Sequence, residues 1–581
     1  MAEMEGESPV VADDAGTGRR IARATGAIGA LKLVWLLVAY ITRQQLNARF
    51  GLGEEIKAYE LGFLLVATIF FTLNDLLPHS VIPVVTRELR EKGERVAWRL
   101  ISTLANLQAI VLVFLVGGAF VLAPLLLMVP AAKAEWIRYD HLTWSIAWQL
   151  IMGRGSPELV SPSFSLMVAA ARVMLLGAVL WSLSSLTYLT LNVYKRFAAP
   201  EFGELASKVV LLAVALTLTP RLGIMGFAAG VAAGGVIRLV AHLIALRGRL
   251  RQYQPVIELR SAALAQIGML MLPLLIGALA SQWLRPWADG YFTGDLPGGL
   301  GALKSARRLT DPLIQVFPLA LGIAIFPFVA ELAVKKNRAA IGRAMGAGLR
   351  AVSFVFIPLT VGLLIMSEPA VRLLFEYGRF TGENTRWAAA AMQMYALGLL
   401  ALSAEQVILQ IYFGMSDTRT PTALGIAALL LQVGAVWAGV TLLSGPIRSD
   451  PGVGFRVVAG GYAFAKTTKV VALLALLPLL HKGIMRGRAA EGARFLVRLA
   501  VAVGAMAITV YALLQWSLAA VQQVEIVSLL ARLFTLALPA AGGVVVFFAV
   551  TALLRIEETG RMWSVARQLW SSGIGRRSAG G

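Results

Sequence analysis

Long apolar runs of about twenty residues or more recur along the whole chain. That length matches an α-helix that crosses the hydrocarbon core of a bilayer, whereas a transmembrane β-barrel would show shorter segments of alternating polarity. The pattern therefore predicts an all-α polytopic membrane protein with about fourteen transmembrane helices. We place these spans near residues 25–47, 60–86, 100–128, 164–191, 203–220, 223–246, 262–284, 300–332, 345–366, 387–413, 420–443, 453–480, 494–518 and 525–554.

Two short motifs recur at corresponding places six spans apart. The second span ends in IPVVTRELREKGE (82–94) and the eighth in FPFVAELAVKKN (326–337), while YKRFAAP (194–200) is echoed by MSDTRTP (415–421). Repeats of this kind are typical of transporters built from related halves, which bind substrate between them. They predict two pseudo-symmetric six-helix lobes followed by two additional helices.

The predicted organisation therefore has five parts. They are a disordered cytoplasmic tail (1–22), an N-lobe of six spans (23–250), a C-lobe of six spans (251–485), two C-terminal helices (486–556) and a basic cytoplasmic tail (557–581).

Composition agrees with a membrane protein, and charge adds its orientation. The 581 residues are 58% hydrophobic and 15% charged, with a formal net charge of +21. In membrane proteins Lys and Arg gather in cytoplasmic loops. The connections 87–99, 247–260, 335–343 and 481–498 are basic, which places both termini in the cytoplasm. The charge thus reflects topology, and we expect no nucleic-acid partner.

Several kinds of chemistry are not indicated. The chain has no cysteine, and its four histidines are scattered rather than spaced as metal ligands. It contains no phosphate-binding loop, no H-E-x-x-H motif and no G-x-S-x-G motif. We therefore expect no catalytic residues, no metal site and no cofactor, and a transporter rather than an enzyme.

The strongest candidate site begins the eighth predicted span. Lys304, Arg307 and Arg308 share one helical face, and Asp311 follows Arg307 by four residues and can pair with it. A charge near the bilayer centre costs about 2.5 to 3.5 kcal/mol, so three cations there favour an interior site that binds an anion. The alternative is that they snorkel to lipid headgroups. Prolines 312, 318 and 327 are expected to bend or interrupt this helix.

Other polar residues lie within predicted spans. Arg43 and Lys32 are further candidates for an anionic substrate, whereas Asn74, Asp75 and Glu405 are candidates for supporting roles. Three other cations either touch substrate, or snorkel to the membrane surface or pair across helices: Arg172, Lys208 and Arg238. The glycines 226, 230 and 234, at four-residue spacing, predict close helix packing.

Four stretches together resemble the MurJ/MviN family of lipid II flippases. The likeness is strongest in FEYGRFTGENTRWAAAAMQMYALGLLALSAEQVILQIYFGMSDTRTP (375–421) and in ARRLTDPLIQVFPLALGIAIFPFVAEL (306–332). ARFGLGEEIKAYELG (48–62) and SVIPVVTRELREKGE (80–94) are similar to the family's first pair of helices. The resemblance covers most of the chain and is weak in 129–163 and beyond 480.

The resemblance implies a fold, a cargo and site residues. The fold is that of the multidrug, oligosaccharidyl-lipid and polysaccharide exporters, in which two lobes surround a cationic cavity and the last two helices form a lipid groove. The cargo would be the undecaprenyl-pyrophosphate-linked peptidoglycan precursor, moved outward across the bacterial cytoplasmic membrane by alternating access. Arg308 falls on the family's eighth-helix arginine and Arg43 on the arginine late in its first helix.

The chain departs from the family at three places, which keeps alternatives open. Ile69 and Phe70 stand where the family tends to have arginines, Lys57 stands near a family acid, and Lys32 is out of register with the earlier first-helix arginine. Another polyprenyl-linked oligosaccharide is an alternative cargo. A non-transporting scaffold for peptidoglycan enzymes is another alternative, whereas a membrane glycosyltransferase lacks a suitable external loop.

The expected partners follow from this reading. They are the lipid-linked glycan precursor, membrane lipids and cell-wall synthesis enzymes, and we expect the chain to act as a monomer. The membrane potential or an ion gradient would drive transport, since no nucleotide site is present in the sequence. The coupling ion stays open.

Overall fold

The computed structural model describes residues 31, 34–128, 131, 136, 161–194, 196, 198–278, 284–335, 337–415, 417–480, 489–523 and 529–560. Within them the secondary structure consists of helices and turns, without a strand, which confirms the predicted all-α class. The predicted tail 1–22, Lys32 and most of the predicted tail 557–581 lie outside the described residues.

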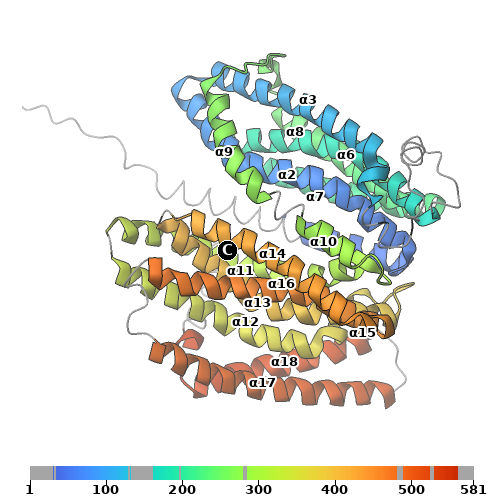
Figure 1. Ribbon diagram of the computed structural model, residues 1–581, viewed down its shortest axis with the longest axis vertical. Helices are drawn as coiled ribbons and strands as arrows, with labels where there is room; N and C mark the ends of the chain where they lie inside the picture. Colours follow the sequence, from blue (N-terminus) through green and yellow to red (C-terminus); the bar gives the residue numbers. More distant parts are fainter. Residues whose placement is uncertain are drawn as a thin grey trace, which may run out of the picture. The chain divides into compact units, whose positions relative to one another are not determined.

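Helical residues 34–50 precede the first labelled helix. The labelled elements are α2 (Glu54–Glu91), α3 (Glu94–Leu126), α6 (Pro162–Val193), α7 (Ala198–Leu222), α8 (Met225–Leu246), η2 (Leu250–Gln252), α9 (Ala262–Ala278), α10 (Arg285–Phe292), α11 (Gly299–Val334), α12 (Arg338–Phe375), α13 (Gly382–Gly414), α14 (Arg419–Leu442), α15 (Ser444–Ser449), α16 (Pro451–Leu480), α17 (Ala489–Gln523) and α18 (Leu529–Leu553) (Figure 1).

The long helices follow the predicted apolar runs closely. In the described part of the chain, ten helices are long and apolar enough to cross a membrane. Each of them covers one predicted span, and α11 covers the predicted 300–332 span. The chain is therefore a polytopic membrane protein, while the predicted total of about fourteen spans stays a prediction.

The chain divides by its internal contacts into two compact units. Unit 1 comprises Met1–Leu46 and Ala58–Trp283, and unit 2 comprises Asn47–Lys57 and Leu284–Gly581. Helix α9 belongs to unit 1, because Ala263 and Ile267 are buried in the same apolar cluster as residues of α2, α3 and α6. The predicted lobe boundary at residue 250 stays a prediction, since compactness does not by itself define symmetry-related halves.

Close contact between α7 and α8 is set by glycines in unit 1. A Cβ atom built on Gly226 would lie 2.6 Å from the backbone nitrogen of Thr219, and one on Gly230 would lie 2.6 Å from the carbonyl oxygen of Leu211. A Cβ atom on Gly234 would lie 2.9 Å from the carbonyl oxygen of Ser207. The predicted close packing at these three glycines is confirmed.

Unit 2 is built on α11, α12, α13 and α16, which share buried apolar clusters. The C-terminal helices α17 and α18 pack on α12 through another cluster, in which Phe354 of α12 lies 5.2 Å, between ring centroids, from Phe547 of α18. The predicted final pair of helices therefore docks on unit 2 along α12, and it belongs to the same compact unit.

Helix α11 differs from its prediction in one respect. Its α-helical hydrogen bonding is assigned without a break from Gly299 to Val334, so Pro312, Pro318 and Pro327 do not interrupt it. Each proline removes a single backbone donor, and the neighbouring turns of a long helix keep the remaining bonds. The expected interruption is wrong, whereas the bend expected as its alternative stays a prediction.

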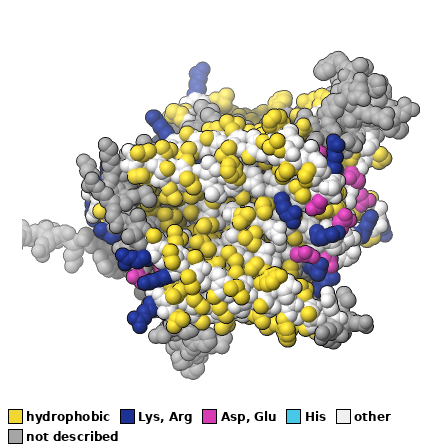
Figure 2. Space-filling model, turned by 60° about the horizontal axis from the view of Figure 1, so that its bottom comes forward, with side chains coloured by type: hydrophobic (Ala, Val, Ile, Leu, Met, Phe, Trp, Pro, Cys, Tyr) yellow, Lys and Arg dark blue, Asp and Glu magenta, His cyan; other side chains and the backbone are white. Residues whose placement is uncertain are grey.

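Large apolar side chains are exposed on many helices. Examples on α17 and α18 are Ile508, Trp516 and Val545, which are 73%, 59% and 67% exposed. On the face shown in Figure 2, apolar side chains cover the middle and the charged ones gather toward the edges. Exposed apolar surface of this extent is expected where lipid replaces water.

Candidate functional site

The cationic residues predicted in the eighth span lie at the start of α11. The helix begins after Gly298, whose φ of 79° lies in the left-handed region that favours glycine. Lys304, Arg307 and Arg308 are partly exposed, whereas Leu303 and Ala306 are fully buried. The predicted cationic face is therefore present on α11, in unit 2.

Arg307 has a partner that the sequence did not indicate. Its Nη2 atom lies 2.6 Å from Oδ2 of Asp289 on α10, and the Nε2 atom of Gln432 donates to Oδ1 of the same carboxylate at 3.4 Å. Asp289 is 1% exposed. Arg307 thus pairs with Asp289 rather than with Asp311, the partner predicted from the four-residue spacing.

Two tyrosines lie against the arginines of this cluster. The guanidinium of Arg285 lies 4.0 Å from the ring centroid of Tyr462, and that of Arg307 lies 4.9 Å from Tyr395 and 5.8 Å from Tyr462. The two rings contact each other edge to face, with centroids 5.9 Å apart. Such contacts stabilise a cation that has lost water. Sequence analysis missed Arg285, because it lies just beyond a predicted span.

Glu405 joins α13 to α16. Its carboxylate lies 2.6 Å from Nζ of Lys469 and 3.0 Å from Nζ of Lys466, and only 4% of Glu405 is exposed. Lys469 lies close to Gly425 of α14, since a Cβ atom on this glycine would lie 3.4 Å from Nζ of Lys469. Glu405, predicted as a supporting residue, is therefore the shared partner of the buried Lys469 and the half-buried Lys466.

In unit 1, the candidate Arg43 pairs with Glu60 of α2, and both side chains are buried. No spacing pattern in the sequence indicates this pair, since Arg43 and Glu60 are separated by a turn between helices. Asn74 and Asp75 lie within α2, but their side chains are outside the described part of the structure, as is Lys32. Convergence of Arg43 and Arg308 on one chamber stays a prediction.

The other intramembrane cations of unit 1 contact protein groups. Arg238 of α8 pairs with Glu204 of α7 and lies 5.1 Å from the ring centroid of Trp181. Arg172 donates through Nε to the carbonyl oxygen of Phe120 at 3.1 Å. Pairing across helices, one of the predicted alternatives, is therefore observed for both arginines.

Lys208 of α7 also contacts aromatic side chains of unit 1. Its Nζ atom lies 5.2 Å from the ring centroid of Trp181 and 5.7 Å from that of Trp35.

The connection between the first helix and α2 packs within unit 2. The Nδ2 atom of Asn47 donates to Oγ of Ser305 at 3.1 Å, and the backbone nitrogen of Arg379 donates to the carbonyl oxygen of Ala48 at 2.6 Å. Gly378 has a φ of 59°, and a Cβ atom there would lie 2.1 Å from that same carbonyl oxygen. Two of the stretches that carry the family resemblance thus pack against each other.

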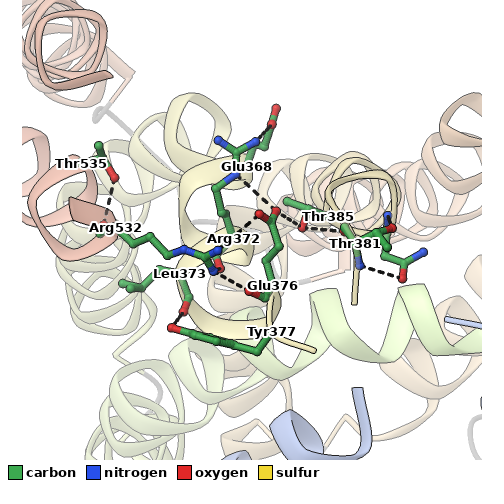
Figure 3. Close-up of polar contacts among 10 residues, drawn as sticks. Glu368, Arg372, Leu373, Glu376, Tyr377, Thr381, Thr385, Arg532 and Thr535 are labelled. Atoms are coloured by element: carbon green, nitrogen blue, oxygen red, sulfur yellow. Dashed lines mark hydrogen bonds and ion pairs between the residues drawn. The ribbon is translucent and has the colours of Figure 1, made fainter. Parts of the chain in front are cut away.

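A polar network fixes α18 to the end of α12 (Figure 3). Nη1 of Arg532 donates to the carbonyl oxygens of Arg372 at 3.1 Å and Glu376 at 2.5 Å. The carboxylate of Glu376 accepts from Oγ1 of Thr385 on α13 at 2.7 Å and pairs with Arg372 at 3.3 Å. In the N-terminal half of α12, Nε of Arg350 lies 3.2 Å from Oε1 of Glu558. Polar contacts therefore flank the apolar α12–α18 interface.

A second polar cluster lies just beyond the end of α6, in unit 1. The hydroxyl of Tyr194 donates to Glu94 at 2.9 Å and accepts from Nε1 of Trp98 at 2.9 Å, while the guanidinium of Arg249 lies 3.5 Å from its ring centroid. Burial, followed by the hydrogen bond to Glu94, raises the pKa of Tyr194 to about 12. The phenol therefore stays protonated as a donor, and the cluster is structural.

Among the described residues, no group of three His, Cys, Asp or Glu side chains is arranged to hold a metal ion. The arrangement is instead rich in cations, and guanidinium, ammonium and phenol donors are chemically suited to contact anionic groups.

Comparison with known proteins is consistent with this chemistry. A family model described as lipid II flippase MurJ matches residues 142–535. The probable lipid II flippase MurJ of Vibrio cholerae is 27% identical over 246 residues, which cover 42% of this chain and 47% of the relative. The lipid II flippase MurJ of Burkholderia cenocepacia is 23% identical over 307 residues, 50% of this chain and 60% of the relative. The chain spans about half the length of the curated relatives it matches.

Solved structures show the same fold. A lipid II flippase MurJ in an inward closed conformation aligns with a TM-score of 0.67 and 15% identity, covering 91% of this chain and 98% of that one. An inward-facing MATE family transporter of the MOP superfamily aligns with a TM-score of 0.57 and 16% identity, and the alignment covers 78% of this chain and 96% of that one. Since the family model covers more than half of the chain, this multi-pass inner-membrane protein belongs to the lipid II flippase MurJ family, a family of membrane transporters.

Proposed function

We propose that this protein is a flippase that moves the undecaprenyl-pyrophosphate-linked peptidoglycan precursor, lipid II, to the outer leaflet by alternating access. Family membership supports the proposal, and one observation carries it. Three cations occupy a partly exposed face at the start of an otherwise apolar helix of 36 residues. A pyrophosphate is the anionic part of this cargo, and guanidinium and ammonium groups are suited to bind it.

The ion pairs of the structure refine the roles of the candidate cations. Arg307 and Arg43 each have a buried carboxylate partner, Asp289 and Glu60 respectively. A cation that is already paired with a carboxylate attracts a second anion less strongly. We assign pyrophosphate binding to Arg308, Arg307 and Lys304 together with Arg43 and Lys32, as the lobes rock about the bound headgroup, and the buried partners of Arg307 and Arg43 should reduce the contribution of these two arginines.

The membrane potential supplies the drive in this proposal. Moving one negative charge outward across an inside-negative membrane is favoured by about 2.3 kcal/mol per 100 mV. A headgroup with a pyrophosphate thus gains free energy by outward movement without nucleotide hydrolysis or a cofactor. The proposal places both termini in the cytoplasm and treats the chain as a monomer in contact with lipids and cell-wall synthesis enzymes.

Substitution of Arg308 tests the function. Arg308→Glu should abolish the rescue of cells depleted of their own lipid II flippase, because it places a carboxylate beside the pyrophosphate. Arg308→Lys keeps the charge and should retain part of the rescue, and both variants are compared at equal amounts in the membrane. The second measurement is the accessibility of lipid II at the outer face. Full rescue by Arg308→Glu at normal expression would contradict the assignment.

A second candidate cargo is another polyprenyl-linked oligosaccharide. It is favoured by Ile69, Phe70 and Lys57, which depart from the family pattern at charged positions. Under this alternative, the wild-type chain fails to expose lipid II but restores the glycan in cells that lack another polyprenyl-glycan flippase. Rescue of growth without exposure of lipid II or another lipid-linked glycan would instead identify a scaffold for cell-wall enzymes.

A further inference from the structure

Three buried polar atoms without a hydrogen-bond partner belong to one aromatic and cationic cluster in unit 2. They are the Nε atoms of Arg285 and Arg307 and the hydroxyl oxygen of Tyr395. Tyr395 is 3% exposed. The three side chains come from α10, α11 and α13, and Tyr462 of α16 contacts all of them through its ring. A buried donor left without an acceptor costs about 1 to 3 kcal/mol, so three in one cluster require an explanation.

The aromatic rings do not supply the missing acceptors. At 4.0 Å from the centroid of Tyr462, the Arg285 guanidinium is close enough to present its face to the ring. The N–H groups of a guanidinium lie in its plane and donate from its edges, so a ring that covers the face leaves the edges available. The phenol of Tyr395 also lacks a hydrogen-bond partner. Its ring contacts Arg307 and Tyr462, while its hydroxyl forms no hydrogen bond.

Cationic side chains surround these unpartnered donors. Asp289 is occupied by Nη2 of Arg307 and by Gln432. Asp311 is exposed, so solvent screens its electrostatic action on Arg307 and Arg285. Lys466 adds a further cation at 6.0 Å from the ring centroid of Tyr462, and it shares Glu405 with Lys469. The unpartnered donors therefore lie in a cationic environment.

Unpartnered donors of two guanidinium groups and a phenol in one place identify the class of ligand. We propose that Arg285, Arg307 and Tyr395 form an oxyanion-binding site within unit 2 that takes a phosphate-class group. The group comes either from a free oxyanion or from the pyrophosphate of a lipid headgroup. A phosphate group has several oxygens, which can accept from the edges of two guanidinium groups and from a phenol at the same time. The carboxylate of Asp289 is already engaged by Arg307 and does not supply these acceptors. The proposal rests on lipid II transport only for the second of these sources.

Binding of inorganic pyrophosphate to the full chain in detergent tests the site. The affinity is measured by titration calorimetry at constant ionic strength. Tyr395→Phe removes only the hydroxyl and should raise the Kd about 5- to 10-fold, since one hydrogen bond to a charged group is lost. Arg285→Gln should raise the Kd about 10- to 100-fold. Tyr395→Phe keeps the experiment informative if Arg285→Gln does not fold.

Tyr412→Phe is the matched control. Tyr412 is another buried phenol on α13, and its hydroxyl donates to the carbonyl oxygen of Leu473 at 2.7 Å. Its removal should lower stability and leave the affinity for pyrophosphate unchanged. The proposal is overturned if wild-type protein does not bind pyrophosphate, or if Tyr395→Phe and Arg285→Gln bind it as wild type does. It is also overturned if Arg308→Gln abolishes binding while Tyr395→Phe has no effect.

Competition identifies the source of the oxyanion. The titration is repeated in nanodiscs with and without a saturating amount of lipid II. If lipid II raises the apparent Kd for pyrophosphate in the wild type but not in Tyr395→Phe, the result supports the site and identifies the lipid headgroup as the source of the oxyanion. An unchanged Kd that still depends on Tyr395 supports the site with a free oxyanion as its source, even if lipid II transport by this chain fails.

Discussion

The two units differ in how they neutralise cations inside the membrane. In unit 1, each of two buried arginines has a carboxylate of its own. Arg43 pairs with Glu60, and Arg238 pairs with Glu204 across the α7–α8 contact. The exposed fractions of the two arginines are 9% and 5%. One carboxylate for each guanidinium leaves little net charge, so each pair attracts a further anion weakly, and Arg238, which the proposed function does not use, is assigned to the scaffold.

In unit 2, several cations share a carboxylate. Lys466 and Lys469 share Glu405. Arg307 forms an ion pair with Asp289, and the guanidinium of Arg285 packs against the ring of Tyr462. This contrast shows that a count of intramembrane cations does not locate an anion site. Unpartnered guanidinium nitrogens also occur in unit 1, on Arg238 and Arg249, whereas in unit 2 the unpartnered atoms of Arg285, Arg307 and Tyr395 belong to one cluster.

The largest expected effect concerns the shared carboxylate. Glu405→Gln leaves two ammonium groups of α16 without their buried counter-charge, and loss of one member of a buried ion pair costs about 3 to 5 kcal/mol. We expect a large fall in thermal stability in detergent. Glu405→Leu combined with Lys466→Met and Lys469→Met should recover most of it, because apolar replacements remove the unpaired charges.

Glu331→Gln is the control for this prediction. Glu331 pairs with Lys335 one turn away, and both side chains are more than 60% exposed. An exposed pair of this kind should give no measurable change in melting temperature. If Glu405→Gln were as mild as the control, the lysines would not depend on Glu405, and the contrast between the units would lose its best example.

The next effect tests one-to-one pairing in unit 1. Arg238→Gln leaves Glu204 without its partner, and Glu204 is 24% exposed, so water reduces the cost to about 2 kcal/mol. The double variant Arg238→Gln with Glu204→Gln should be close to wild type, since two amides can hydrogen-bond to each other. Stability is measured by thermal unfolding, and transport by the exposure of lipid II.

The transport measurement shows whether Arg238 belongs to a structural ion pair or binds the substrate. If Arg238 serves only the scaffold, the double variant should transport as wild type does. A stable double variant that fails to transport would place Arg238 at the substrate and remove the distinction drawn between the units.

Much of the fold could be predicted because it depends on local pattern. Apolar runs of membrane length located α3, α6 and the other long helices, and spacing alone placed Lys304, Arg307 and Arg308 on one face. Glycine spacing predicted the contact of α8 with α7. These features follow from helical periodicity and length, which a single segment carries in full.

The partners of the charged residues could not be predicted in this way. Periodicity indicates neighbours within one helix, and it suggested Asp311 for Arg307, whereas the carboxylate comes from Asp289 of another element. Glu60 was likewise missed as the partner of Arg43. Such pairs depend on how helices pack, and no signal in one sequence fixes that. The interruption expected at the prolines of α11 failed for a different reason, since a long helix keeps its other hydrogen bonds.

The smallest effect asks whether packing or charge holds α7 against α8. Gly230→Ala places a methyl group 2.6 Å from the carbonyl oxygen of Leu211, so α7 must shift, at a cost of about 1 to 2 kcal/mol. Gly117→Ala is the control, because no atom lies within 4 Å of a Cβ there and the better helix propensity should stabilise α3 slightly.

The same shift moves Glu204 of α7 away from Arg238 of α8, so the two effects should be coupled. In a double-mutant cycle, Gly230→Ala should cost less in a background that already carries Arg238→Gln with Glu204→Gln, because no ion pair remains to be strained. Additive costs would show that the glycine contact and the ion pair are independent, and that charge pairing in unit 1 does not depend on the close approach of its helices.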